Sequence, residues 1–405
     1  MLHTAAERSS RATIAPHKSA LAIIALLRLV PRAGAMTTKR VARVLPPTPD
    51  GIERAGGVLR SGGLCAFPTE TVYGLGASAL DERAVRRVFE VKERPLSDPL
   101  IVHVAKPEDA PALVYLDEPC RTAFDALTKA FWPGPLTLVC PARSHLPDCL
   151  SAGTSTVGVR CPSHELARRL IDAAGVPVAA PSANKFGHVS PTTAAHVLDD
   201  LGGEDISILD GGASGSAQCE HGIESTVVGL RTEGTTCHLT LYRRGALPRA
   251  SLEDVCSQVG ARLNTAETYA SESKPDASGS PGQLLTHYAP RLPAALCTVV
   301  ADAAADDAKS DAYLANCVVV DFNGRLKALE KSARAYRDLS SAGDAAVAAN
   351  ALFDTLRWAE GVPGAANVFI ADLSEERASS ALIAGVADRV YRAASGNAIE
   401  IPRAG

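Results

Sequence analysis

The chain has 405 residues, more than one compact domain usually holds, so its length predicts two or three domains. Apolar residues make up 46% and charged residues 21%, values typical of folded proteins, which excludes a disordered or fibrous chain. The formal net charge of −4 argues against a protein that coats nucleic acid through bulk positive charge. None of the ten cysteines forms a C-x-x-C pair, which excludes a zinc ribbon or a thioredoxin-type motif.

The first forty residues differ from the rest, with seven Lys or Arg and one acid. Their apolar run, residues 20–27, is too short to span a membrane. Three interpretations stay open: a secretory signal, an organelle transit peptide, or an extension in front of the second methionine, Met36. We expect residues 1–40 to be a disordered extension or a targeting segment. The expected location is cytoplasmic, with the mitochondrion or plastid as the alternative if residues 1–35 act as a transit peptide.

Helix and strand signals alternate from residue 50 to about residue 260. Asp81 and Ser163 are suited to cap two of the helices, and Ser190-Pro191 resembles the start of another. Helices are predicted at 51–60, 82–92, 117–131, 164–174 and 191–201. Short strands are predicted at 64–67, 100–104, 136–140, 156–160, 176–180, 206–209, 225–230 and 238–243. Because the last strands follow one another closely, we predict an α/β (α+β) domain with a large twisted mixed sheet, part of it antiparallel.

A second, smaller domain follows a polar segment, residues 263–281, whose Ser, Ala and Pro content is typical of a linker. Beyond it, strands at 295–300, 316–322 and 367–373 alternate with helical stretches at 344–360 and 381–394. This alternation predicts a smaller, doubly wound α/β domain. The predicted boundaries are 41–262 for the first domain, 263–290 for the linker with a lid, and 291–405 for the C-terminal domain.

The polar segments of the first domain are the candidates for chemistry. Residues 67–76, FPTETVYGLG, place hydroxyls, a carboxylate and glycines after a buried strand, although ordinary turn residues look the same. Lys92 and Arg94 end a helix before Pro95, where two cations can hold a polyphosphate or merely complement the helix dipole. Ser182 and Asn184 follow an apolar strand and have the character of an anion-binding loop.

Two further side chains are ambiguous when taken alone. His103 lies among apolar strand residues and is either a core histidine or a ligand contact. Arg160 ends a strand, where it suits a carboxylate or a surface ion pair.

The order of these motifs identifies a family resemblance. FPTETVYGLG, KERP, PLIVHV, WPGPLTLV, VGVRCP, APSAN, SPT, DGG and GIESTVV follow one another as they do in the YrdC-type domain. Pro281-Gly282 and His287-Tyr288-Ala289-Pro290 resemble the interdomain signature of its long, two-domain members, the threonylcarbamoyl-AMP synthases. The resemblance is dense over residues 50–250, and the C-terminal domain matches in position and size.

The resemblance implies synthesis of L-threonylcarbamoyladenylate from L-threonine, bicarbonate or CO2, and ATP, with release of pyrophosphate. The product would serve downstream machinery that modifies the adenosine next to the anticodon of tRNA, with at most weak contact to tRNA itself and none to a membrane. Transferred by position, the threonine site would comprise Thr69, His103, Arg160, Ala180 and Ser225. The ATP site would comprise Lys92, Arg94, Thr156, Ser182, Asn184, Ser190 and Arg243. Tyr288 would cover the site as a lid, and Mg²⁺ would accompany ATP without ligands from protein side chains.

Two departures from the family pattern leave points open. Tyr242-Arg243-Arg244-Gly245 offers two arginines for the nucleotide, of which Arg243 is favoured by its distance from the glycine. Residues 283–286, before His287, lack the usual basic residues. Three rival interpretations remain: a double-stranded RNA-binding module without synthase activity, carbamoyl transfer as in a hydrogenase-maturation protein, and a scaffold with an inactive site. The second would require paired C-x-x-C motifs, which the chain lacks.

Overall fold

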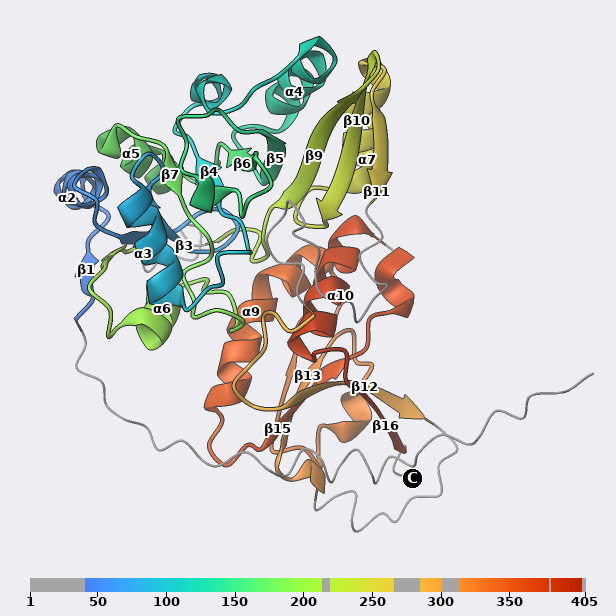
Figure 1. Cartoon of the computed structure of the whole chain (residues 1–405). Coiled ribbons are helices and arrows are strands. Elements are labelled where there is room, and N and C mark those ends of the chain that lie inside the picture. Colours follow the sequence, from blue (N-terminus) through green and yellow to red (C-terminus); the bar gives the residue numbers. More distant parts are fainter. Residues whose placement is uncertain (1–40, 213–218, 266–284, 301–312, 379, 403–405) are drawn as a thin grey trace, which may run out of the picture. The chain divides into compact units, whose positions relative to one another are not determined.

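The computed structural model describes residues 41–212, 219–265, 285–300, 313–378 and 380–402 (Figure 1). The first domain is a mixed sheet with the strand order β1-β8-β2-β3-β7-β4-β6-β5-β9-β10-β11. In chain order these strands are Arg43–Leu45 (β1), Cys65–Phe67 (β2), Gly74–Ser78 (β3), Ile101–His103 (β4), Leu136–Pro141 (β5), Thr156–Arg160 (β6), Val178–Ala179 (β7), Ser207–Leu209 (β8), Thr226–Glu233 (β9), Thr236–Arg243 (β10) and Arg262–Thr265 (β11). The predicted large mixed sheet is confirmed.

Side-chain caps mark the starts of some helices of this domain. They are Pro49–Arg60 (α2), Glu82–Lys92 (α3), Glu118–Phe131 (α4), Glu165–Ala174 (α5), Ala194–Leu201 (α6) and Arg249–Gln258 (α7). Asp81 caps α3 by accepting from the backbone N–H groups of Arg83 and Ala84. Helix α3 ends at Glu93, which has a left-handed φ of 56°, so the chain turns away and leaves Lys92 buried in the last turn.

Two predicted helix starts are wrong. Helix α6 begins at Ala194, not at Pro191, because the hydroxyl of Thr193 accepts from the His196 N–H and caps the helix there. The hydroxyl of Ser190 instead donates to Glu224, as described below. Helix α5 follows His164, whose side chain makes no capping bond, so Ser163 does not cap it.

Strands β9 and β10 form a long antiparallel hairpin, drawn in yellow in Figure 1, and β11 adds to it in parallel. Residues 263–265 of the predicted linker therefore belong to the sheet, and the remainder of that segment up to residue 284 lies outside the described residues. The core of the domain is built from Ala, Val and Leu, with few aromatic side chains such as Phe89 and Phe124.

The C-terminal domain holds a second sheet, in which every pairing is parallel. Its order is β14-β13-β15-β12-β16, with bounds Ala294–Val300 (β12), Cys317–Asp321 (β13), Ala335–Asp338 (β14), Asn367–Ala371 (β15) and Ala398–Pro402 (β16). Helices α9 (Ala345–Gly361) and α10 (Ala381–Ala393) lie where helical stretches are predicted. Consecutive strands of a parallel sheet are joined by crossover connections, and these helices provide two of them, α9 from β14 to β15 and α10 from β15 to β16.

The sheet of the first domain determines which polar side chains meet. In the parallel pair β4 and β6, His103 lies opposite Arg160. The loop from Phe67 to Gly74 joins the antiparallel strands β2 and β3. Strand β9 runs parallel to β5 and pairs Thr226 with Leu136, so Ser225 lies beside the start of β5.

Candidate functional site

A cavity lies where these loops converge. It is lined by Thr69, Thr71, Val72, Gly74, Arg94, Pro99, Ile101, His103, Arg160, Ala180, Pro181, Ser182, Glu224, Ser225, Arg243, His287 and Tyr288. All five residues predicted to contact threonine are in this wall, together with three of the residues predicted for ATP and the predicted lid residue. Residues far apart in the sequence thus share one site, as the resemblance requires.

Arg160 contacts three partners beside the cavity. Its Nη2 pairs with Glu70 Oε1 at 2.7 Å, Nη1 donates to the hydroxyl of Thr71 at 3.0 Å, and Nε donates to the carbonyl of Gly134 at 3.3 Å. Burial opposes the charge of Glu70, but the Arg160 guanidinium outweighs this and lowers the pKa of Glu70. A guanidinium has five N–H groups, so these contacts leave two for a bound carboxylate.

Arg243 contacts Ser225 through two hydrogen bonds. Its Nε donates to the Ser225 carbonyl at 3.1 Å, and its Nη2 donates to the Ser225 hydroxyl at 3.1 Å. That hydroxyl is also 2.8 Å from the hydroxyl of Thr137. Burial lowers the pKa of Arg243, and this outweighs the opposite effect of Tyr288 and Glu224. Arg244, the alternative nucleotide contact, is not among the lining residues.

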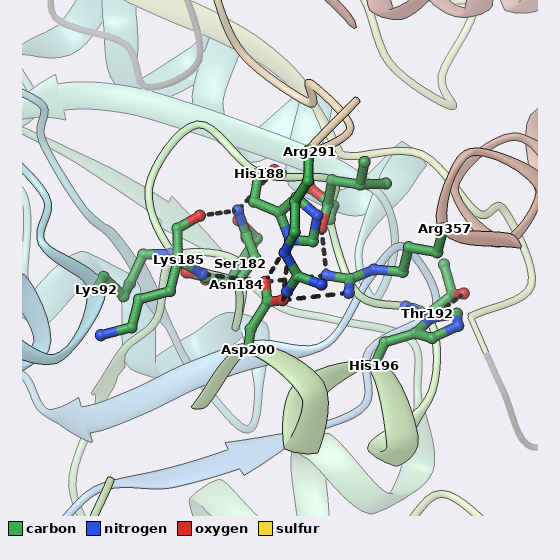
Figure 2. Close-up of polar contacts among 12 residues, drawn as sticks. Lys92, Ser182, Asn184, Lys185, His188, Thr192, His196, Asp200, Arg291 and Arg357 are labelled. Atoms are coloured by element: carbon green, nitrogen blue, oxygen red, sulfur yellow. Dashed lines mark hydrogen bonds and ion pairs between the residues drawn. The ribbon is translucent and has the colours of Figure 1, made fainter. Parts of the chain in front are cut away.

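Lys92 and Arg94 hold the loops next to the cavity. Lys92 Nζ donates to the carbonyls of Ser182 at 2.7 Å and Asn184 at 2.5 Å, which Figure 2 shows. Arg94 donates to the carbonyls of Asp98 and Pro99 and pairs with the Asp98 carboxylate at 3.0 Å. Burial lowers the pKa of both side chains, and their mutual repulsion adds to this for Lys92. Lys92 therefore shapes the loop behind the cavity instead of lining it.

Both histidines of the wall are neutral. Burial, reinforced by Arg160, lowers the pKa of His103 to about 3. Burial and the nearby Arg94 and Lys92 lower the pKa of His287 well below its usual value. The Nδ1 atom of His103 is buried and has no hydrogen-bond partner among the described residues. A neutral imidazole of this kind can bind a hydroxyl or an amine, but its low pKa makes it a poor general base.

Tyr288 closes the cavity. It has a left-handed φ of 60°, is 1% exposed, and stacks on Phe353 of α9 with ring centroids 5.4 Å apart. Its hydroxyl is buried without a hydrogen-bond partner among the described residues. The free volume left inside is about 50 Å³, enough for a few water molecules. His287 and Tyr288 therefore restrict the space that a ligand can occupy.

Four predicted ATP residues do not line the cavity: Lys92, Thr156, Asn184 and Ser190. Asn184 supports its own loop by donating to the carbonyls of Lys185 and His188. Thr156 is at the opposite end of β6 from Arg160, pairs with Pro141, and lines a separate depression. The structure does not bring Thr156 to the cavity.

Sequence reasoning missed Glu224 and His287 as wall residues and Glu70 as the partner of Arg160. Glu70 and Glu224 lie inside the quoted motifs FPTETVYGLG and GIESTVV, so their motif positions were the available signal. Glu224 Oε1 accepts from the Ser190 hydroxyl at 2.6 Å, which explains why Ser190 lies one layer behind the wall.

A second group of charges, which we call the Asp200 cluster, comprises His188, Asp200, Arg291, Arg357 and Glu360, and Figure 2 shows its members other than Glu360. The side chains of this cluster are buried except that of Arg291, which is 59% exposed. His188 bridges two carboxylates, with Nδ1 2.8 Å from Asp200 and Nε2 3.0 Å from Glu360. Burial opposes the charge of His188, but its bonds to both carboxylates outweigh this and raise its pKa. Each charge in this cluster therefore has an opposite charge beside it.

Neither a metal cage nor a membrane span is found in the described part of the chain. Its His, Cys, Asp and Glu residues form no group of three or more that suits a metal ion. No helix in that part is long and apolar enough to cross a bilayer. Each oxygen of Glu224, the one acid among the lining residues, already accepts a hydrogen bond.

The fold and the cavity define an α/β protein with a site lined by arginine, histidine and hydroxyl side chains. A family model described as "Telomere recombination" matches residues 57–245, and a second, "Threonylcarbamoyl-AMP synthase, C-terminal domain", matches residues 247–395. The threonylcarbamoyl-AMP synthase of Vibrio cholerae is 34% identical over 168 residues, which cover 41% of this chain and 88% of that protein. The chain belongs to the threonylcarbamoyl-AMP synthase family.

Longer relatives align over a larger share of the chain. The threonylcarbamoyl-AMP synthase of Pyrococcus abyssi is 44% identical over 239 residues, or 59% of this chain and 65% of the relative. That of Bacillus subtilis is 42% identical over 250 residues, or 61% and 66%. The alignments thus span just under two thirds of these relatives.

A solved structure matches over a larger share of the chain. The crystal structure of P. abyssi Sua5 complexed with L-threonine has a TM-score of 0.72 and 33% identity, and the match covers 89% of this chain and 99% of that one. These likenesses support the synthase interpretation and not the RNA-binding alternative.

Proposed function

We propose that this chain makes L-threonylcarbamoyladenylate from L-threonine, bicarbonate or CO2, and ATP, and releases pyrophosphate. The observation that carries the proposal is the convergence of three guanidinium groups, from Arg94, Arg160 and Arg243, on one cavity with hydroxyls and neutral histidines. All the substrates of this reaction except CO2 carry anionic groups, so bringing them together requires cations that screen their mutual repulsion. Relatives with this activity in their names, and a threonine complex of one of them, support the same assignment.

The threonine end of the cavity would lie at Arg160 and His103. The two N–H groups that Arg160 retains suit the carboxylate of the amino acid. Neutral His103, Thr69, Ala180 and Ser225 line the remainder of this end. The amine of threonine attacks the carbon of CO2, or of bicarbonate with loss of hydroxide, and loses a proton to give a carbamate.

The nucleotide end would lie at Arg94, Ser182 and Arg243. There an oxygen of the carbamate attacks the α-phosphorus of ATP, the bond from that phosphorus to the bridging oxygen breaks, and pyrophosphate leaves with the electron pair. Alignment of the reactants supplies up to about 7–11 kcal/mol of the barrier to such a step. Lys92 would contribute by fixing the loop that carries Ser182 and Asn184.

Mg²⁺ would reach the site on the phosphates of ATP. The donor set of the wall fits this arrangement better than a protein cage, because Glu224 is its one carboxylate among the described lining residues and each of its oxygens is already bonded. When bound, the ion would neutralise phosphate charge. The product would pass to the enzymes that modify tRNA, and we propose that the chain acts in the cytoplasm.

The direct test is to incubate the purified chain with threonine, ¹³C-labelled bicarbonate and ATP, and to analyse the products by mass spectrometry. The proposal predicts threonylcarbamoyladenylate carrying one labelled carbon, together with pyrophosphate in equal amount. Omission of threonine should abolish both. Pyrophosphate without the adenylate, or neither product from folded protein with Mg²⁺ present, would refute the proposal.

A further inference from the structure

The C-terminal domain contacts the loop that carries Glu224 into the wall of the cavity. Asn350 of α9 donates from Nδ2 to the carbonyls of Cys219 and Glu220, at 3.0 and 2.9 Å. Gly222 has a left-handed φ of 65°, and a Cβ added to it would lie 2.4 Å from the Cα of Asn350. The loop is therefore packed directly against α9, which leaves no room for a side chain at residue 222.

Arg389 of α10 extends this contact to the cavity wall. The side chain is fully buried, and its Nε donates to Glu224 Oε2 at 3.1 Å. Its Nη1 donates to the carbonyl of Arg244, the residue after Arg243. Its guanidinium carbon lies 5.7 Å from the centre of the Tyr288 ring, within range of a cation–π interaction. One side chain of the C-terminal domain thus contacts three segments that surround the cavity.

The charge of Glu224 makes this contact matter for binding. Among the described lining residues Glu224 is the one acid, and it shares the wall with the cations Arg94, Arg160 and Arg243. An anionic ligand placed there is repelled by Glu224 unless a cation balances it, and buried charges interact strongly at such distances. Ser190 donates to the other oxygen of Glu224, so the carboxylate is fixed on both sides.

We propose that Arg389 is a positioning residue for the nucleotide: it neutralises Glu224 and holds Tyr288 and the Arg243–Arg244 segment in place, so that ATP binds to a cavity completed by the C-terminal domain. This inference rests on the proposed function, because it takes ATP to be the anionic ligand. This inference gives the C-terminal domain a role in binding, although none of its described residues lines the cavity. Arg389 itself touches no reacting atom in this account.

The test is a double-mutant cycle with Arg389→Gln and Glu224→Gln, in which ATP affinity is measured by calorimetry and the KM for ATP is measured alongside kcat. We expect R389Q to weaken ATP binding about tenfold or more in the wild-type background, because it leaves Glu224 unbalanced. In the E224Q background the same change should cost less than about threefold, since no charge remains to be balanced. We expect kcat at saturating ATP to change less than KM.

Arg392→Gln is the comparison on the same helix, because Arg392 is similarly buried and pairs with Asp388, which also lies 3.6 Å from Arg389. It should lower the melting temperature but change ATP affinity by less than about twofold. If R389Q does not fold alone, the charge-neutral double variant and Arg389→Lys, which keeps the charge, supply the comparison. Equal losses in both Glu224 backgrounds, or equal losses for R389Q and R392Q, would overturn the inference. Calorimetry separates this result from the proposed function, which fails if the wild-type chain forms no adenylate.

Discussion

The cavity and the Asp200 cluster both contain buried charges, but the pKa of the histidine in the cluster shifts in the opposite direction to the pKa of three cations around the cavity. In the Asp200 cluster the pKa of Asp200 and Glu360 is lowered and that of His188 is raised, because each charge has an opposite partner. Around the cavity burial lowers the pKa of Lys92, Arg94 and Arg243, and it outweighs the opposite effect of nearby acids such as Asp98 and Glu224. The first pattern is that of a structural contact, and the second is that of a site that awaits an anion.

The largest effect should come from Arg160→Gln, which breaks the buried ion pair between Arg160 and Glu70 beside the cavity. Removal of one partner leaves Glu70 buried and unpaired, so we expect the free energy of unfolding to fall by about 3–5 kcal/mol, together with loss of adenylate synthesis. Urea denaturation and the product assay measure the two effects. Adding Glu70→Gln should restore much of the stability but none of the activity. Recovery of activity in that double variant would show that Arg160 does not bind substrate.

Arg243→Gln should reduce stability less than Arg160→Gln does, while it weakens the binding of ATP. Arg243 donates two hydrogen bonds to Ser225, and hydrogen bonds that involve a charged group contribute about 1.5–3 kcal/mol, so we expect a loss of stability in that range but at least a tenfold rise in the KM for ATP. Chemical denaturation and steady-state kinetics test both. A stability loss as large as that of the Arg160 variant, with an unchanged KM, would erase the distinction between the two cations.

His188→Gln tests the structural character of the Asp200 cluster through pH. Because the folded pKa of His188 is raised, its contribution to stability is complete below about pH 6.5, the usual histidine pKa, and is lost as pH rises through the folded pKa. Buried histidines with lowered pKa, such as His103, oppose this trend, so the difference between wild type and variant is the useful quantity. We expect it to be about 1.5–3 kcal/mol at pH 6 and to shrink towards pH 9. A difference independent of pH would mean that His188 is not charged.

Tyr288→Phe should give the smallest change. The hydroxyl of Tyr288 has no described hydrogen-bond partner and is buried, so its removal should leave the unliganded protein as stable as before or up to about 1 kcal/mol more stable. If the hydroxyl contacts bound ligand, the KM for threonine or ATP should rise a few-fold. Melting curves with and without ligands measure both effects. A clear loss of stability without ligand would show that the hydroxyl has a structural partner.

The sequence specified the local elements well and their assembly less well. Alternation of apolar segments, caps such as Asp81 and the stop at Pro95 placed α3 and its neighbours within a few residues. The Ser190-Pro191 start failed because Glu224, distant in the sequence, accepts the Ser190 hydroxyl, and no local pattern encodes that contact. Residues 263–265 of β11 begin a largely polar segment, so the sequence predicts a linker there. Only their pairing with β10 makes them part of a strand.

The sequence motifs predicted which segments form the site, but not which of their residues line the cavity and which support it from behind. Motif order brought out nine of the residues that line the cavity, yet composition could not separate wall residues from supports such as Lys92 and Asn184. The role of Arg389 could not be predicted, because it depends on a contact between Arg389 and Glu224, which lie 165 residues apart in the sequence and belong to different domains.

The central claim is that one cavity holds threonine and ATP together. A crystal structure of the chain with L-threonine and a non-hydrolysable ATP analogue tests it most directly. The account predicts that both ligands occupy the same cavity, with the threonine carboxylate on Arg160, the phosphates near Arg94 and Arg243, and the His287–Tyr288 segment displaced from its present position and reclosed over them. Density for either ligand at a different place on the protein, with this cavity still at its present volume, would contradict the account.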